Sequence, residues 1–300
     1  MKQKDSVFTS SVVKIDHPAM SKAMHIIPVG DVHYTSPMHS QEGFATARRD
    51  WQRMDPETTW YIWTGDEHET TSCSERPVFE DGRIHESTLS KLDKVMAEDC
   101  EELYEKCKFM AGHILGMIQG NHFWVFQSSC PKRGIVVGMT STEYMCKLFG
   151  TKWLGYLNYM RLSIDIQGAR TAMDLVTAHG KAGGKLVGTP INQVNDLRTI
   201  FPAADIYTMG HDHTRGALPA SCLQAPNGCS KGDFVIKQKR QWLGRSGCFL
   251  RGYVENEQNY PVKALYRPTE IGYIKYETKF SRPNSKLGKA VLTVDTHCWA

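Results

Sequence analysis

Short apolar runs alternate with segments of helical periodicity between about residues 24 and 213. The runs are Met24–Val29, Trp60–Thr64, Leu115–Gln119, Met173–Ala178 and Asp205–Met209. Apolar runs of four to eight residues are typical of buried strands, and their alternation with helices indicates βαβ units. We therefore predict an α/β fold for this part of the chain.

Four helices are predicted between these strands by apolar spacing and by capping residues. They cover roughly Ser40–Met54, roughly Leu89–Met110, Thr140 to Gly150 and Thr189 to Ile200. Thr140 and Glu143 form a capping box, and Gly150 supplies a C-terminal stop. Thr189 is expected to cap a helix whose first residue is Pro190.

The pattern changes after Thr214, where aromatic and β-branched segments are separated by Gly, Pro and Asn. Short antiparallel strands are predicted at Phe234–Lys239, Phe249–Val254, Val262–Tyr266 and Tyr273–Tyr276. No Pro/Gly/Ser-rich linker precedes them, so we expect a single domain. The chain is predicted to have an N-terminal arm at 1–22, one domain at 23–280 and a C-terminal tail at 281–300. Within the domain, we expect helical insertions at about 67–112 and 123–160 and a strand-rich part at 214–280.

The amino-acid composition is typical of an ordinary globular protein and excludes few functions. The 300 residues are 41% hydrophobic and 23% charged, as in ordinary globular proteins, and the net charge is +4. This charge permits a phosphate-bearing substrate but is low for a dedicated nucleic-acid-binding domain. The nine cysteines include no C-x-x-C, which favours a reducing, cytoplasmic location. The first twenty residues contain no apolar signal region, and no apolar stretch is long enough for a membrane span, so we expect no membrane association.

Every one of the five apolar runs is followed by a polar cluster that contains Asp, Asn or His. In chain order the clusters are Gly30-Asp31-Val32-His33, Gly65-Asp66-Glu67-His68-Glu69, Gly120-Asn121-His122, His179-Gly180 and Gly210-His211-Asp212-His213. Ligands of open α/β sheets bind at the carboxyl ends of the strands, so these clusters are expected to converge. The glycines would allow close approach of the backbone.

The types of side chain in these clusters indicate a metal site. Asp and His without Cys suit Mn, Fe, Zn or Mg. The candidate ligands are too many for one tetrahedral ion and fit two metals that share a carboxylate: Asp31, His33, Asp66, Asn121, His179, His211 and His213. Paired metals clamp the oxygens of a phosphoryl displacement and lower the pKa of a bound water toward about 7, which supplies hydroxide at neutral pH.

The ordered motifs D-x-H, G-D-x-x-E, G-N-H, H-G and G-H-x-H resemble those of the calcineurin-like metallophosphoesterases over roughly residues 24–215. The resemblance implies a four-layer α-β-β-α sandwich with mixed sheets and a dinuclear centre. It implies that Asp31, His33 and His213 hold one metal and that Asn121, His179 and His211 hold the other. Asp66 would bridge the two metals.

The same resemblance implies catalytic roles for Asp66, His122 and Glu69. His122 would contact the phosphate together with Asn121 and protonate the leaving group, and Glu69 would orient His122. Phe123 stands where the family commonly has an acidic residue, a departure that bears on the orientation of His122. Thr70-Thr71 replaces the Arg-Gly of protein Ser/Thr phosphatases, which argues against a phosphoprotein substrate.

A looser likeness concerns the overall layout, including "TEYMCKLFG" and "RQWLGRSGCFLRGY", which is similar to that of bacteriophage-encoded phosphoesterases. The location would then be the cytoplasm of the host cell. The expected activity is a metal-dependent phosphodiesterase with two divalent ions, Mn being favoured over Fe, Zn, Ni and Mg. The alternatives are a DNA or RNA nuclease, a phosphomonoesterase, and a non-catalytic binding module.

Several residues outside the ligand set have two interpretations. The basic residues near the C-terminus either follow a nucleic-acid backbone or line a solvated strand face: Lys237, Lys239, Arg240, Arg245 and Arg251. The run from Phe123 to Phe126 either stacks a nucleobase or belongs to the core. Asp212 and His68 match no ligand position, and Asp212 is expected to form local hydrogen bonds.

Overall fold

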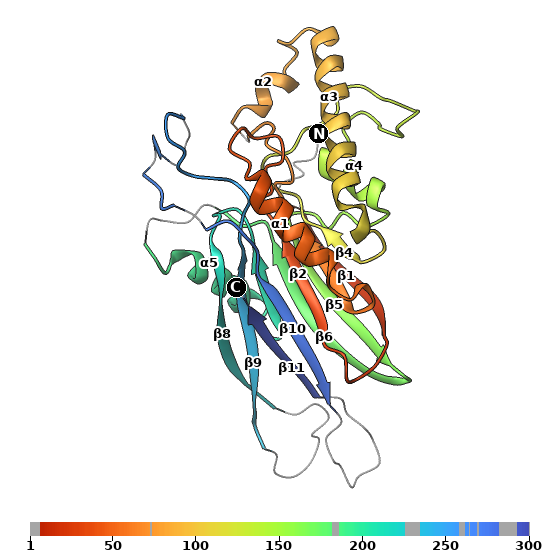
Figure 1. Ribbon diagram of the computed structural model, residues 1–300, viewed down its shortest axis with the longest axis vertical. Helices are drawn as coiled ribbons and strands as arrows, with labels where there is room; N and C mark the ends of the chain where they lie inside the picture. Colours follow the sequence, from red (N-terminus) through yellow and green to blue (C-terminus); the bar gives the residue numbers. More distant parts are fainter. Residues whose placement is uncertain are drawn as a thin grey trace.

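Two mixed β-sheets form the centre of the molecule, and helices lie on their outer sides (Figure 1). The computed structural model describes residues 7–72, 74–181, 186–225, 235–257, 262–263, 265–268, 270–281 and 293–299. Within these residues, no helix combines the length and the apolar character needed to cross a bilayer.

The first sheet has six strands. From edge to edge they are β1 (Phe8–His17), β5 (Leu157–Ile166), β6 (Ala169–Ala178), β7 (Ile206–Met209), β9 (Lys237–Ser246) and β8 (Arg215–Gln224). β6, β7 and β9 run parallel to one another, whereas β5 and β8 run antiparallel to the neighbours β6 and β9.

The second sheet has five strands. In spatial order they are β11 (Thr293–Trp299), β10 (Lys275–Ser281), β2 (Met24–Val29), β3 (Thr59–Trp63) and β4 (Ile114–Met117). β2, β3 and β4 are parallel, so their carboxyl ends lie at the same edge of the sheet.

The helices vary in length, and the four longest bury an apolar face. In chain order the helices are α1 (Gln41–Gln52), η2 (Pro56–Thr58), α2 (Arg76–Glu80), α3 (Glu86–Cys107), η3 (Lys108–Met110), α4 (Ser141–Phe149) and α5 (Thr189–Ile200). The predicted capping box of Thr140 and Glu143 is confirmed, and Gly150 ends α4 in the left-handed conformation. The cap of α5 differs from prediction, because Gly188 occupies it and Thr189 is already helical.

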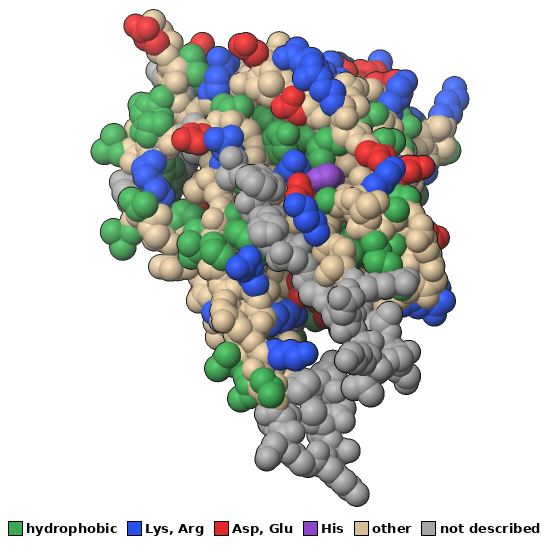
Figure 2. Space-filling view, turned by 60° about the horizontal axis from the view of Figure 1, so that its bottom comes forward, with side chains coloured by type: hydrophobic (Ala, Val, Ile, Leu, Met, Phe, Trp, Pro, Cys, Tyr) green, Lys and Arg blue, Asp and Glu red, His purple; other side chains and the backbone are tan. Residues whose placement is uncertain are grey.

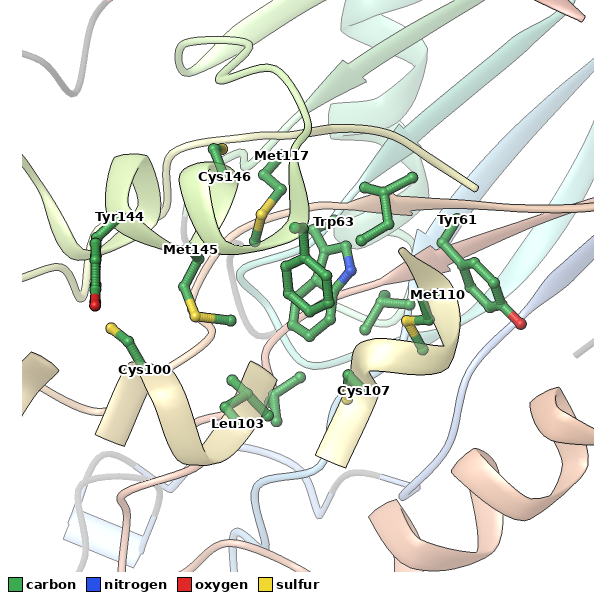
Figure 3. Close-up of a cluster of buried hydrophobic side chains, with 14 of the residues drawn as sticks. Tyr61, Trp63, Cys100, Leu103, Cys107, Met110, Met117, Tyr144, Met145 and Cys146 are labelled. Atoms are coloured by element: carbon green, nitrogen blue, oxygen red, sulfur yellow. The ribbon is translucent and has the colours of Figure 1, made fainter. Parts of the chain in front are cut away.

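Three buried hydrophobic clusters separate four layers. One lies between α1, α3, α4 and the second sheet, and Figure 3 shows its members Trp63, Leu103 and Met145. Another contains Ile26 of β2 and Leu162 of β5, so it fills the space between the two sheets. The last places Val194 of α5 against the first sheet. These clusters confirm the predicted four-layer α-β-β-α architecture.

The five strands predicted before Thr214 are present, but the C-terminal strands differ from prediction. Two of the four predicted short strands overlap observed ones, Phe234–Lys239 with β9 and Tyr273–Tyr276 with β10, and Phe234 itself lies outside the described residues. Phe249–Val254 forms only an isolated bridge at Leu250, the described residues of Val262–Tyr266 form no strand, and β8 was not predicted. Pairing with distant strands decides these boundaries, since β9 joins both β7 and β8.

Both ends of the chain contribute strands where an arm and a tail were expected. Residues 8–17 of the expected arm form β1, which pairs in parallel with β5. Residues 293–299 of the expected tail form β11, which pairs with β10. The remaining parts, 1–6, 282–292 and residue 300, lie outside the described residues.

Candidate metal centre and active site

The polar clusters that follow β2, β3, β4, β6 and β7 meet at one place, although the strands belong to two different sheets. Main-chain hydrogen bonds join the loops directly: the amide of His33 donates to the carbonyl of Asp66 at 3.0 Å. The amide of Gly210 donates to the carbonyl of His179, also at 3.0 Å. The predicted convergence of the strand ends is therefore present, and it includes the ends of both sheets.

The loops hold the candidate ligands in an unusual backbone conformation. In the described chain, eight residues other than glycine have a positive φ, and five of them are candidate ligands: Asp31, His33, Asp66, His211 and His213. Such conformations are costly for residues with a Cβ, and they concentrate at functional sites. The strained backbone at these five residues thus sets the direction in which their side chains point.

Glycines allow the loops to approach one another. A Cβ on Gly30 would lie 2.0 Å from Oγ1 of Thr64, and one on Gly120 would lie 2.1 Å from Oδ1 of Asp66. Real Cβ atoms do not approach other heavy atoms so closely, so both positions require glycine.

Asp31, His33 and His213 bring their side-chain donors together, and we call them the first donor set. Nε2 of His33 lies 3.1 Å from Nε2 of His213. Oδ1 of Asp31 lies 3.6 Å from the same atom of His213.

Asp66, His179 and His211 form the second donor set, and Asn121 lies beside it. Nδ1 of His211 lies 3.0 Å from Nε2 of His179. The amide oxygen of Asn121 lies 2.6 Å from that nitrogen of His211 and 2.7 Å from that of His179. Four side chains from four strand ends thus direct donor atoms toward a single point.

Asp66 belongs to the second donor set and also faces the first. Its Oδ2 is 3.2 Å from Nε2 of His179 and 3.9 Å from Nε2 of His33. Its other oxygen, Oδ1, accepts a hydrogen bond from the amide of His122 at 2.8 Å. One oxygen therefore faces both sets while the other orders the loop after β4.

Two of the candidate histidine ligands, His179 and His33, contact oxygen atoms through their other ring nitrogen. Nδ1 of His179 lies 2.8 Å from the carbonyl oxygen of Thr64, and Nδ1 of His33 lies 2.5 Å from Oε2 of Glu69. An imidazole that donates one N–H to a carbonyl or carboxylate presents its other nitrogen as a lone-pair donor. This is the arrangement found around histidines that bind metals.

Glu69 also contacts His122 at the rim of the site. Its Oε1 lies 3.1 Å from Nδ1 of His122, whose side chain is 22% exposed. The contact that the sequence predicted between Glu69 and His122 is present, but the contact with His33 was not predicted. The carboxylate spans the gap between a buried ligand candidate and the accessible histidine.

Burial and mutual charge displace the pKa values of these groups in opposite directions. Burial raises the pKa of Asp31 to about 7, against the opposing effect of His179. Burial also tends to raise the pKa of Asp66, but interactions with His179, His33 and His122 outweigh this effect. They hold the pKa of Asp66 well below its usual value. Burial lowers the pKa of His211 to about 3, so its imidazole is neutral.

This donor set fits two divalent cations. Pairs of imidazole nitrogens lie about 3 Å apart, next to buried carboxylate oxygens and the amide oxygen of Asn121. Neutral imidazoles, carboxylates and amide oxygens are the ligands of borderline and hard divalent ions. The residues that would hold the ions are those predicted, with Asp66 placed to serve both.

The aromatic run after His122 belongs to the core and offers no stacking platform. Phe123 is 3% exposed, and the guanidinium of Arg76 lies 3.6 Å from its ring centroid. Trp124 is also buried and donates its indole N–H to Asp93 of α3 at 2.7 Å. Arg76 was missed by sequence reasoning; it also donates to the carbonyl oxygen of Asn121 at 2.7 Å, and no motif could have indicated this contact.

The basic residues near the C-terminus do not form one surface. Arg245 is completely buried, and Lys239 pairs with Asp205 at 2.8 Å. Lys237 and Arg240 are exposed on β9. On the face shown in Figure 2, Lys and Arg side chains are interspersed with acidic and apolar ones. The predicted alternative of a nucleic-acid footprint is therefore wrong for Arg245.

Comparisons with known proteins give a faint likeness only. No protein-family model matches this chain, and none of the curated proteins does. A structure of Vps29 from Chaetomium thermophilum has a TM-score of 0.33 at 6% identity, with 92% of this chain and 97% of that chain covered. Wild-type Vps29 from Entamoeba histolytica, complexed with zinc, has a TM-score of 0.33 at 10% identity, with 92% and 99% covered. Likeness at this level assigns neither a family nor an activity to this chain.

Proposed function

We propose that this protein is a metal-dependent phosphoesterase whose substrate is a phosphodiester. The observation that carries the proposal is the pair of adjoining donor sets, in which the Asp66 carboxylate of the second set also faces the first. Two metals in adjoining sites would act on the attacking and leaving oxygens of a phosphoryl displacement. Zinc, iron, nickel and magnesium are alternatives to manganese, since these ligands accept all of them.

When bound, two divalent ions supply Lewis acidity toward the phosphoryl oxygens and an activated water at neutral pH. The chain supplies their positions. Asp31, His33 and His213 would hold one ion, and His179, His211 and Asn121 would hold the other. The Asp66 carboxylate, which faces both groups, would contribute to both.

His122 acts on the leaving group. The Glu69 carboxylate holds Nδ1 of its ring, so Nε2 is the nitrogen that faces the substrate and donates a proton to the departing oxygen. The partial exposure of this ring is consistent with contact to a substrate that enters from solvent.

The alternative activities differ in the substrate that reaches the site. A nuclease would use Lys237 and Arg240 of β9 to contact the phosphate backbone, and neutralising them would abolish cleavage of oligonucleotides only. A phosphomonoesterase would prefer the aryl monoester over the diester. A binding module would hold metal without turnover.

A substrate panel tests the proposal. Aryl phosphodiesters, aryl monoesters, cyclic nucleotides, nucleoside monophosphates and oligonucleotides are incubated with the protein and Mn, Ni, Zn or Mg. We expect turnover of the aryl diester that Asp66→Asn abolishes and that Asp16→Asn, at an exposed position of β1, leaves unchanged. Two bound ions without turnover of any substrate would contradict the catalytic proposal.

A further inference from the structure

Arg245 is a buried arginine at the carboxyl end of β9, directly beside the candidate metal centre. It is fully buried and pairs in register with Met209 of β7, the strand whose end carries His211 and His213. A Cβ on Gly180, the residue after His179, would lie 3.5 Å from its Nη1. The guanidinium thus lies where the histidine-bearing ends of β6 and β7 come together.

The guanidinium bonds to two different parts of the chain. Nη1 donates to the carbonyl oxygen of Gly210 at 2.6 Å, and Nη2 lies 3.3 Å from Oδ2 of Asp212. Both acceptors belong to the loop that carries His211 and His213. On the other side, Nε donates to the carbonyl oxygen of Pro190 at 2.9 Å, and Nη2 donates to Oε1 of Gln193 at 2.5 Å. These two residues lie in the first turns of α5.

A fully buried charge is costly unless it is paired and its hydrogen bonds are satisfied. Here the planar guanidinium donates hydrogen bonds to three acceptors and forms an ion pair with Asp212, an arrangement that an ammonium group cannot reproduce. Asp212 is held from its other oxygen as well, since Oδ1 accepts from the amide of Thr214 at 3.1 Å. The Gly210–Thr214 loop, which carries both histidines, is therefore held at its start through Gly210 and in its middle through Asp212.

We infer that Arg245 is a positioning residue that fastens the Gly210–Thr214 loop to α5 and so sets the directions of His211 and His213. The inference rests on the proposed function, because it assigns to Arg245 the task of holding one ligand from each ion. Supporting contacts behind metal ligands commonly contribute about 10- to 100-fold in metal affinity.

The test compares Arg245→Met and Arg245→Lys with Arg161→Met. Arg161 is a matched control because it lies in the same sheet and forms a bidentate ion pair with Asp174. Cobalt titration, read by visible absorption, reports both the affinity and the coordination geometry. Histidine ring resonances of the metal-free protein report the positions of His211 and His213 without any ion.

We expect Arg245→Met to weaken cobalt binding by about 10- to 100-fold and to change the absorption bands. Arg245→Lys is expected to recover part of the affinity. Arg161→Met is expected to lower the melting temperature and to leave both the affinity and the bands unchanged. A folded Arg245→Met protein with wild-type affinity and bands would overturn the inference.

If Arg245→Met does not fold, the same cobalt titration on Asp212→Asn tests the inference, because this variant removes only the charge that faces the guanidinium. We expect a smaller loss of cobalt affinity with altered bands, and wild-type behaviour would overturn the inference. If the wild-type protein binds no divalent ion, the proposed function fails. The metal-free histidine resonances then decide the inference alone: those of His211 and His213 must shift in either variant while those of His17 and His25 stay.

Discussion

The carboxylate of Glu69 lies 2.5 Å from Nδ1 of His33, and this contact ties the rim of the site to its buried interior. Because Glu69 also contacts His122, one side chain orients both a metal-ligand candidate and the candidate acid. The two histidine rings lie 5.3 Å apart between centroids. Changes at Glu69 are therefore expected to affect metal binding and proton transfer together.

Glu69→Gln is expected to lower manganese affinity by about tenfold and to lower turnover further. A glutamine amide has one acceptor oxygen and one donor nitrogen, so it cannot accept hydrogen bonds from His33 and His122 through two separate oxygens. Isothermal titration and steady-state kinetics measure the two effects. The control is Glu57→Gln, at an exposed carboxylate that pairs with Lys22. An unchanged manganese affinity in Glu69→Gln would show that the contact with His33 does not support the metal.

His122→Gln is expected to keep both metals and to lower turnover by about 10²- to 10⁴-fold. The loss should depend on the substrate: esters with a poor alkoxide leaving group should suffer most, since a nitrophenolate departs without protonation. Metal analysis together with rates for a series of leaving groups measures this. Equal losses for all leaving groups would argue that His122 only binds the phosphate.

Removal of metal is expected to lower the melting temperature. A ligand present at 100 times its dissociation constant stabilises the folded state by about 2.7 kcal/mol, and two ions add their contributions. Dialysis against a chelator and re-addition of manganese, followed by thermal unfolding, test the reversibility. Asp66→Asn should unfold at a temperature that manganese hardly changes, whereas Asp16→Asn should respond as the wild type does.

Gly30→Ala is expected to destabilise the fold by about 1–3 kcal/mol, because the added Cβ meets Thr64 and Ser246 and must push the loops apart. Gly216→Ala is the control, since a Cβ there meets nothing within 4 Å. Denaturant unfolding at pH 7 compares the two. Equal free energies of unfolding for the two variants would show that the loops around Gly30 accommodate a Cβ without loss of stability.

Asp174 gives a pH-dependent contribution to stability away from the metal centre. Burial raises its pKa, but bonds from Arg161 and Tyr159 outweigh burial and hold the pKa below its ordinary value of 3.8. A depressed carboxylate pKa stabilises the folded state above the unfolded pKa, and this stabilisation is lost as the pH falls through the folded pKa. We expect Asp174→Asn to cost about 1–3 kcal/mol at pH 7 and progressively less below pH 3.8. A difference in unfolding free energy that does not change with pH would contradict this.

Local features of the chain predicted most of the elements that carry the site. The capping box of Thr140 and Glu143 depends on groups three residues apart. The apolar run of β2 and the glycine that follows it can be read from the sequence without knowing which strands pair with β2. The order of Asp, Asn and His after successive strands indicated which side chains would meet. These signals are local, so the linear pattern contains them.

The tertiary structure alone decided how those pieces combine. Which strands pair is set by packing across the sheets, and this placed β1 and β11 at sheet edges where an arm and a tail were predicted. The fold also buried Arg245, which by its sequence context was one basic residue among several. The contact of Glu69 with His33 joins positions 36 residues apart, and its existence depends on the register of two parallel strands. Hydrophobic and capping patterns act within a few residues, whereas burial, charge pairing and ligand geometry arise only after distant segments are packed together.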